Sequence, residues 1–589
     1  MEKVAALIAK YPRWIALVAG GASATGFAPL NLWPLTLLCL ALLMHFVASA
    51  GSGKRAFMIG WLFGVGHFSI GNNWIATAFT YQAAMPVWLG WIAVVLLALY
   101  LAVYPALACW GAWWVAQLHS KQEIRHSRVG GSPTPDMASK PNGQEMDSRV
   151  DLRSPSARGN DENSGNGNGL SYILAFAGFW IITEWLRSWV FTGFPWNPLS
   201  AVLLKDFFGP PFVRVAGTYG SSGWIILTVG IFIWTWQYHR YRHPEFSKSN
   251  GREALVAWLF FPILWLAPQT IVDNFSETEL AGEGGVSLTI VQPNISQIDK
   301  HTAGYEAVNF VRLAQNSRPK GDYPRLLLWP EAAIPWWLDD GYPRQAYFNQ
   351  PGGTAVGTRA TLAKLLGSKD VLLTGGDRLV FGANGNVVGA RNSVLAMDAE
   401  GEILSTYDKA HLVPFGEYLA LRWLLEPLGA TRLVPGVIDF LPGPGPRTLD
   451  LPFDGKRVKV GMQICYEIIF SGQVVDRANR PDFIFNPSND AWFGSWGSPQ
   501  VRAQARLRAI EEGLPVVRAT PTGISAIIDA DGRIVESLPS GKAGRIDAFL
   551  PMAKAPTLFA RYGNILPLGF ATLLIALAFL PLVRRRISG

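Results

Sequence analysis

The sequence predicts a bundle of about eight membrane-spanning α-helices that carries one large α/β domain. Its 589 residues are more than one ordinary core needs. The mean hydropathy is +0.19 and only 16% of residues are charged, which is too apolar for a typical soluble protein. The long segment 272–564 contains no spanning run, so the chain is also too polar for a membrane bundle alone. A membrane bundle joined to a soluble domain accounts for all three observations.

Eight apolar runs are long enough to cross a bilayer, which takes about 17–25 helical residues. They cover 12–28, 31–49, 56–78, 87–117, 170–191, 221–237, 254–271 and 565–583. Gly or Pro interrupts the first and seventh runs, and the fourth is long enough to tilt or to extend beyond the lipid. The first run is interpreted as an uncleaved membrane helix, because further apolar runs follow it directly and no small-residue cleavage site stands out.

Lysine and arginine mark one side of this predicted bundle. They occur at the N-terminus and after the second, fourth, sixth and eighth runs, whereas the loops after the first and third runs carry no charge. The positive-inside rule places the basic side and both termini in the cytoplasm, and 272–564 on the outer side. The loop after the fifth run has a few charges of its own. Because the basic residues flank membrane runs, the net charge of +8 indicates topology and no nucleic-acid partner.

The domain organisation follows from these runs. A transmembrane bundle, with runs one to seven, is expected over 1–271, and the eighth run, 565–583, leads to a basic cytoplasmic tail. Within the bundle, 121–169 is rich in Ser, Gly, Asn, Pro and charge, and it has too few large apolar residues to offset the entropy of ordering. We expect this segment to be a disordered cytoplasmic insert.

The segment 285–550 is expected to be a catalytic α/β domain outside the cytoplasm. Short β-branched or Leu-rich runs alternate with helix-like stretches at 303–315, 355–367 and 499–512, and this alternation favours a layered α/β fold. The strand-like runs are 286–291, 326–329, 371–374, 392–397, 458–465, 483–486 and 524–528.

Three residues of catalytic type occupy informative positions in this domain. Glu331 and Cys465 end strand-like runs, and strand ends are where α/β sheets present reactive groups. Lys409 precedes an apolar loop. Cys39 and Cys109 lie in membrane runs, so Cys465 is expected to be an unpaired thiol. A carboxylate that takes the thiol proton and a lysine that stabilises an oxyanion complete an acyl-transfer set. Taken alone, Cys465 would more often be a small core residue, Glu331 an acid at the start of a helix, and Lys409 a solvated surface charge.

Their joint context resembles the Glu–Lys–Cys triad of the nitrilase superfamily. The matching motifs are Trp-Pro-Glu at 329–331, Lys409 followed by His-Leu-Val-Pro-Phe-Gly-Glu at 411–417, and Cys-Tyr-Glu at 465–467. Together with the eight apolar runs, these motifs resemble the bacterial apolipoprotein N-acyltransferase branch of that superfamily. Further matching motifs lie at 184–187, 192–196, 291–295 and 486–493. The resemblance covers nearly the whole chain except residues 121–169.

The resemblance implies a four-layer α-β-β-α sandwich on membrane helices in the bacterial inner membrane, with the catalytic domain in the periplasm. Cys465 would take an acyl chain from a membrane phospholipid, typically phosphatidylethanolamine, as a thioester. It would pass that chain to the N-terminal amine of a diacylglyceryl apolipoprotein. Glu331 would be the general base and Lys409 the oxyanion stabiliser, while Glu417 would support the lysine, and Tyr466 and Glu467 flank the nucleophile.

Further residues are candidates for substrate binding. Phe415, Trp336 and Trp337 are aromatic residues near the motifs that would line an acyl pocket, or else they are ordinary core residues. Glu184 and Arg187, spaced i, i+3 in the fifth run, are either a structural ion pair or a head-group contact. His301 stands where the family commonly has Trp, and Pro521 where it often has Asn.

Two other functions remain open alongside the acyltransferase. A membrane-tethered amidase of nitrilase type would use the same triad and pass the acyl group to water. A transporter or scaffold with an inactive enzyme domain is a different class, against which the intact triad residues count. The sequence shows no metal-ligand cluster, phosphate-binding Gly motif or nucleotide fingerprint, so we expect neither metal nor cofactor.

Overall fold

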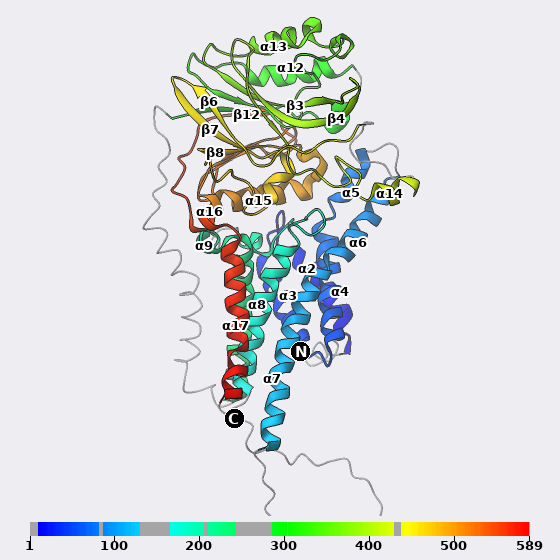
Figure 1. Ribbon diagram of the computed structural model, residues 1–589, viewed down its shortest axis with the longest axis vertical. Helices are drawn as coiled ribbons and strands as arrows, with labels where there is room; N and C mark the ends of the chain where they lie inside the picture. Colours follow the sequence, from blue (N-terminus) through cyan, green and yellow to red (C-terminus); the bar gives the residue numbers. More distant parts are fainter. Residues whose placement is uncertain are drawn as a thin grey trace, which may run out of the picture.

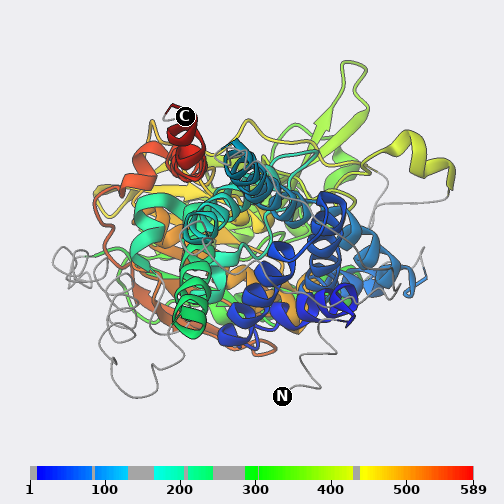
Figure 2. The ribbon, with the colours of Figure 1, turned by 90° about the horizontal axis from the view of Figure 1, so that it is seen from below.

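The computed structural model describes residues 10–81, 86–129, 165–204, 210–242, 285–302, 304–428 and 438–587. It places an α/β domain on one end of a bundle of long helices (Figure 1). The view from below shows the bundle helices gathered beneath that domain (Figure 2). The seventh predicted run, 254–271, lies outside the described residues.

The bundle is built mostly from long helices. These are α2 (Pro12–Ala24), α3 (Trp33–Ala48), α4 (Gly53–Gly71), α5 (Ile75–Ala78), α6 (Leu89–Leu101), α7 (Val103–Val129), α8 (Gly165–Leu186), α9 (Pro210–Arg242) and α17 (Ile565–Ile587), with 3-10 turns at Phe79–Tyr81 and Leu199–Leu203. Helices α2 and α4 cross where only glycine fits: a Cβ at Gly20 would lie 1.9 Å from the Phe63 carbonyl oxygen. Such small-residue contacts are typical of membrane helix pairs.

Four of the described helical stretches are long and apolar enough to cross a membrane. They are Leu89–Ser120, Gly169–Leu186, Phe212–Thr235 and Ile565–Val583. The first two predicted runs form shorter helices, of 13 residues in α2 and 16 in α3, whereas a span takes about 20. The third run is divided, because α4 ends at Gly71 before α5 begins. The described residues therefore do not confirm eight spans.

The predicted disordered insert, 121–169, is helical at both of its ends. Helix α7 continues to Val129 and α8 begins at Gly165, while 130–164 lies outside the described residues. Both ends continue neighbouring helices, and extending an existing helix by one residue is far easier than nucleating a new one. At these two ends the structure has helix where the composition predicts disorder.

The α/β domain contains two six-stranded sheets packed face to face. The first has the order β12-β1-β2-β3-β4-β5 and the second the order β11-β10-β9-β8-β7-β6. The strands are β1 (Ser287–Gln292), β2 (Leu326–Leu328), β3 (Val371–Phe381), β4 (Val387–Met397), β5 (Ile403–Asp408), β6 (Thr448–Phe453), β7 (Lys456–Met462), β8 (Phe483–Pro487), β9 (Val516–Ala519), β10 (Ala526–Ile528), β11 (Ile534–Ser537) and β12 (Gly544–Phe549). Parallel pairs β1–β2–β3 and β7–β8–β9 form the centre of each sheet.

Helices cover both outer faces, which confirms the predicted α-β-β-α sandwich. Helices α12 (Glu306–Ser317) and α13 (Ala355–Ala363) lie on the first sheet, and α15 (Gly494–Glu512) lies between the second sheet and the bundle (Figure 1). Helix α15 begins at Gly494, five residues before the predicted start at 499, and so includes Pro499. The main core, which includes Leu328, Val394, Val460 and Phe485, fills the space between the sheets.

Candidate active site

The ends of strands from both sheets bring the three predicted triad residues together. Glu331 follows β2, Lys409 directly follows β5, and Cys465 follows β7 of the second sheet. The Lys409 ammonium lies 3.5 Å from Glu331 Oε1 and 2.9 Å from Glu417 Oε1, and all three side chains are buried. The sandwich therefore converts three distant sequence positions into one charged cluster.

Glu331 is held as a carboxylate. Its Oε1 accepts a hydrogen bond from Asn392 Nδ2 at 2.7 Å, and its Oε2 accepts one from the backbone N–H of Asn489 at 2.7 Å. Burial acts to raise the pKa of Glu331, but the Lys409 charge and the Asn392 hydrogen bond outweigh it and hold the pKa below its ordinary value. An ionised Glu331 is ready to accept a proton.

Lys409 stays cationic although it is buried. Burial acts to lower the pKa of its ammonium, but the carboxylates of Glu417 and Glu331 outweigh that effect and raise the pKa above its ordinary value. Glu417 is fixed in turn by the backbone N–H of Val413, which donates to its Oε2 at 2.8 Å. A permanent positive charge in a water-poor site is suited to stabilising an oxyanion.

Cys465 sits at a strained turn that opens the 3-10 helix Cys465–Ile469. Its φ of +52° is uncommon for a non-glycine residue and is typical of positions under functional constraint. Burial and the Glu331 charge raise the pKa of the thiol, against the opposing effect of Lys409. Because the Glu331 carboxylate acts electrostatically on this thiol, the proton has a carboxylate to move to when the sulfur attacks.

Glu467 joins the turn that contains Cys465 to the loop that follows Lys409. Its Oε1 accepts the backbone N–H groups of Ala410 and His411, at 2.7 and 3.0 Å, and its Oε2 accepts that of Ile464 at 2.7 Å. The Tyr407 hydroxyl also donates to it at 2.9 Å. Burial raises the pKa of Glu467 to about 7, although the backbone donors act to lower it. Glu467 thus fixes the position of Cys465 relative to Lys409.

Tyr466 and His411 connect the surroundings of Cys465 to the bundle. The Tyr466 hydroxyl donates to the Gly193 carbonyl oxygen at 3.0 Å, and the His411 ring lies 3.0 Å from the Thr192 carbonyl oxygen. We call residues 192–199, which follow α8 and make these contacts, the bundle loop. The loop brings part of the membrane bundle against the residue next to Cys465.

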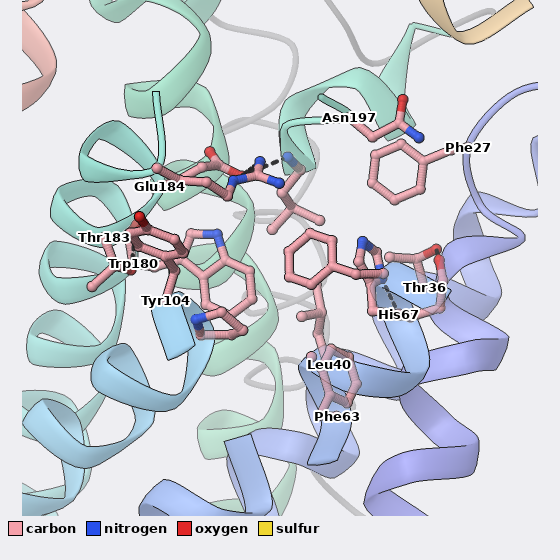
Figure 3. Close-up of a pocket in the computed structure, with 16 residues that line it drawn as sticks. Phe27, Thr36, Leu40, Phe63, His67, Tyr104, Trp180, Thr183, Glu184 and Asn197 are labelled. Carbon is pink, nitrogen blue, oxygen red and sulfur yellow. Dashed lines mark hydrogen bonds and ion pairs between the residues drawn. The ribbon is translucent and has the colours of Figure 1, made fainter. Parts of the chain in front are cut away.

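Glu184 and Arg187 hold the bundle loop from below. Arg187 donates to the Trp196 carbonyl oxygen at 3.0 Å, and Glu184 Oε1 accepts the backbone N–H of Leu199 at 2.9 Å. Both side chains are buried and line a cavity of about 40 Å³ inside the bundle (Figure 3). That volume is enough for a few water molecules and too small for a lipid head group. The placement favours the structural ion pair over the head-group contact.

The predicted aromatic residues do not gather in one place. Trp336 is buried with Trp329 and Leu362 on the helix-covered face of the first sheet, which makes it a core residue there. Trp337 is half-buried, and Phe415 is exposed in the loop between Lys409 and Glu417. The side chain of His301 lies outside the described residues.

Residue-by-residue reading of the sequence missed the asparagines of this site. Asn392 donates from Nδ2 to both Glu331 and Glu417, at 2.7 and 3.1 Å. A polar side chain inside a strand-like run was a detectable signal for Asn392, whereas Asn489 acts through its backbone and leaves no such signal. Among the described residues, no three His, Cys, Asp or Glu side chains are grouped to hold a metal ion.

A buried Glu–Lys–Cys cluster at the strand ends of a two-sheet sandwich defines the class of nitrilase-like enzymes. Residues 288–555 match the family model described as carbon-nitrogen hydrolase. Among solved structures of this fold, an amidase from Nesterenkonia sp. is 18% identical with a TM-score of 0.29, covering 47% of this chain and 94% of its own. Nit3 from Saccharomyces cerevisiae is 19% identical with a TM-score of 0.30, covering 50% and 97%.

The rest of the chain narrows this class to one family. Residues 19–129 and 158–231 match the model described as apolipoprotein N-acyltransferase N-terminal domain. The protein named apolipoprotein N-acyltransferase from Rhodopseudomonas palustris is 34% identical over 98% of this chain and 95% of its own. The one from Bradyrhizobium diazoefficiens is 33% identical over the same shares. The chain belongs to the apolipoprotein N-acyltransferase family.

Proposed function

We propose that this enzyme transfers an acyl chain from a membrane phospholipid, through a thioester on Cys465, to the N-terminal amine of a diacylglyceryl apolipoprotein. The observation that carries the proposal is the Glu331–Lys409–Glu417 cluster beside Cys465, joined to the bundle through Tyr466. A site tied to membrane helices suits two lipid-anchored substrates, because neither acyl chain has to enter bulk water.

In the first step the sulfur of Cys465 attacks the ester carbonyl of the donor while the thiol proton passes to Glu331. The positive charge of Lys409 stabilises the oxyanion that forms. The carbon–oxygen bond then breaks, and Glu331 returns the proton to the departing alkoxide. The products are the Cys465 thioester and a lysophospholipid, for which phosphatidylethanolamine is the proposed source.

In the second step the neutral amine of the apolipoprotein attacks the thioester carbonyl. A carbon–nitrogen bond forms, the carbon–sulfur bond breaks, and Glu331 moves one proton from the amine nitrogen to the sulfur. The thiol of Cys465 is regenerated, and Lys409 stabilises the second oxyanion as it did the first.

The topology belongs to the same proposal. Four described helices are apolar and long enough to span, and the shorter α3 is also apolar. The distribution of lysine and arginine supports eight spans, cytoplasmic termini and a periplasmic catalytic domain in the bacterial inner membrane. Cysteine accessibility labelling from the two sides of intact cells tests this orientation.

The test of function uses the full-length protein in phospholipid micelles with a labelled donor and a diacylated lipopeptide. We expect a labelled thioester, lysophospholipid and N-acylated peptide from the native enzyme, and no thioester from Cys465→Ala. Cys39→Ala is the matched control, because it removes a thiol buried in the bundle and should retain activity. Free fatty acid without acylated peptide would indicate the amidase, and no thioester at all would indicate an inactive scaffold.

A further inference from the structure

Asp377 is a carboxylate at the active site that the mechanism above does not use. It lies in β3 directly opposite Asn392 of β4. Opposite residues of an antiparallel pair project from the same face of the sheet. Asn392 projects to Glu331 and Glu417, to which its amide donates, so Asp377 projects to the catalytic side as well.

With Asp377 ionised, the charges at its position do not balance. The strongest charges that act on Asp377 are the ammonium group of Lys300, the carboxylates of Glu331 and Glu417, and the ammonium group of Lys409. Asp377 makes this a cluster of three carboxylates and two ammonium groups, with one negative charge in excess. Burial raises the pKa of Asp377 to about 6, which leaves it mostly ionised at neutral pH. An added cation would stabilise this cluster.

The oxygens of the other two carboxylates are already occupied. Glu331 accepts from Asn392 and the Asn489 backbone and pairs with Lys409. Glu417 accepts from Lys409, Asn392 and the Val413 backbone. Asp377, in contrast, is partly exposed and makes no hydrogen bond or ion pair with any residue that the structure describes. It is therefore the carboxylate that an incoming group can reach.

We propose that Asp377 binds a primary ammonium group of the substrate and positions it beside Cys465. This inference rests on the proposed function, in which the acceptor is an α-amine. Such an amine has a pKa of about 7.7–8.0 and arrives mostly as a cation at neutral pH. It releases one proton to solvent before the neutral amine attacks the thioester. The ethanolamine head group of the proposed donor carries the same chemical group, so the experiment separates acceptor from donor.

The experiment measures the two half-reactions of full-length Asp377→Asn separately. If the acceptor ammonium binds Asp377, thioester formation stays within about twofold of native, while the KM for lipopeptide in discharging the thioester rises about 10- to 100-fold. If the donor head group binds there, thioester formation slows with phosphatidylethanolamine and is unchanged with phosphatidylglycerol. Either result supports the proposal and identifies the source. Asp377→Glu, which keeps the charge, should recover part of the loss.

Two controls separate ammonium binding from a structural role. Discharge of the thioester by hydroxylamine, which is neutral near pH 7, should be as fast in Asp377→Asn as in the native enzyme. Asp454→Asn removes the same charge from an exposed turn and should change neither half-reaction. Equal slowing with lipopeptide and hydroxylamine, or no slowing with any substrate, would overturn the proposal. Failure of the native enzyme to form a thioester would instead refute the proposed function.

Discussion

Glu331 and Lys409 show how burial and pairing together set the charge of a buried residue. Taken alone, burial would neutralise both side chains, because the charged form of each loses its hydration. Their mutual distance of 3.5 Å, with Glu417 at 2.9 Å from the ammonium, reverses this effect. Both groups therefore remain ionised where the proposed reaction needs a base and a cation.

Replacing Lys409 with Met should remove activity and stability together. Without the ammonium, Glu331 and Glu417 would be buried carboxylates with no cation between them, at a cost of about 3–5 kcal/mol in the free energy of unfolding. Thioester formation should fall by at least about 100-fold. Thermal unfolding and single-turnover thioester formation measure the two effects.

Lys369→Met provides the matched control for that variant. Lys369 pairs with Asp454 on the surface, where an ion pair contributes less than about 1 kcal/mol. If Lys409→Met were as stable and as active as Lys369→Met, the role assigned to the buried cluster would be wrong.

Glu467 should give the protein a characteristic dependence of stability on pH. Its pKa is about 7 in the folded protein against an ordinary value of 4.5, so between these values the folded state binds more protons than the unfolded state. The contribution of Glu467 to stability therefore falls as pH rises from about 4.5 to 7, by roughly 3 kcal/mol at most. Glu467→Gln should remove this slope, although it also weakens the backbone hydrogen bonds. Denaturant unfolding across that pH range measures the slope, and an unchanged slope in the variant would contradict the assignment.

At the scale of elements, the bundle loop 192–199 contacts the turn that contains Cys465 and helps to position it. The loop contacts Tyr466 and His411 above it and is held by Glu184 and Arg187 below it. These are hydrogen bonds to backbone carbonyl and N–H groups, so they depend on the path of the loop more than on its side chains.

Gly193→Ala should distort this loop and slow thioester formation. Gly193 has a φ of +73°, and a Cβ there would lie 2.2 Å from the Ser188 carbonyl oxygen, so the backbone must shift. We expect a loss of stability above about 1 kcal/mol, since strain and steric overlap add, together with reduced thioester formation.

Gly385→Ala isolates the conformational strain, so its comparison with Gly193→Ala gives the steric part of this effect. Gly385 has nearly the same φ, +75°, and a Cβ at this position would have no other atom within 4 Å. The substitution should therefore cost only the conformational strain of about 1 kcal/mol and leave activity unchanged. Equal thioester formation in the two variants would show that the bundle loop does not position Cys465.

At the scale of the whole molecule, a buried polar network joins the α/β domain to the bundle. Glu511 of α15 accepts the backbone N–H of Thr218 at 2.7 Å, its hydroxyl at 2.6 Å, and the Ser471 hydroxyl at 2.6 Å. It also pairs with Arg508 at 2.8 Å. Helix α9 has a non-helical residue, Gly217, just before Thr218, so Glu511 satisfies donors at a newly started helix.

Glu511→Gln should loosen this junction. The change leaves the buried Arg508 without its carboxylate, at a cost of about 3–5 kcal/mol. Thermal unfolding and limited proteolysis of the full-length protein should show earlier opening between the domain and the bundle. The exposed Glu536 is the control, since Glu536→Gln should leave both measurements unchanged, and identical behaviour of the two variants would exclude the role given to Glu511.

Much of this architecture could be predicted from local sequence. Alternating short strands and helices predict a layered α/β domain because each pattern reports on its own segment. The resemblance carried by the motifs implied the four-layer sandwich and predicted Glu331, Lys409 and Cys465 as the triad. Local sequence did not decide the outcome where neighbours in space do. It left Trp336 as either a site aromatic or a core residue, and the structure packs it in a core; the insert ends are helical because they extend α7 and α8.

The sequence by itself determined the kinds of segment and the chemical types of the reacting groups, because hydrophobic patterning and side-chain chemistry are local properties. Tertiary structure decided what those groups can do. It placed Lys409 between two carboxylates, gave Cys465 its strained turn, set Asp377 opposite Asn392 and brought the bundle loop against Tyr466. These relations join residues that are up to hundreds of positions apart, and charge, strain and hydrogen bonding act through space, so only the folded chain determines them.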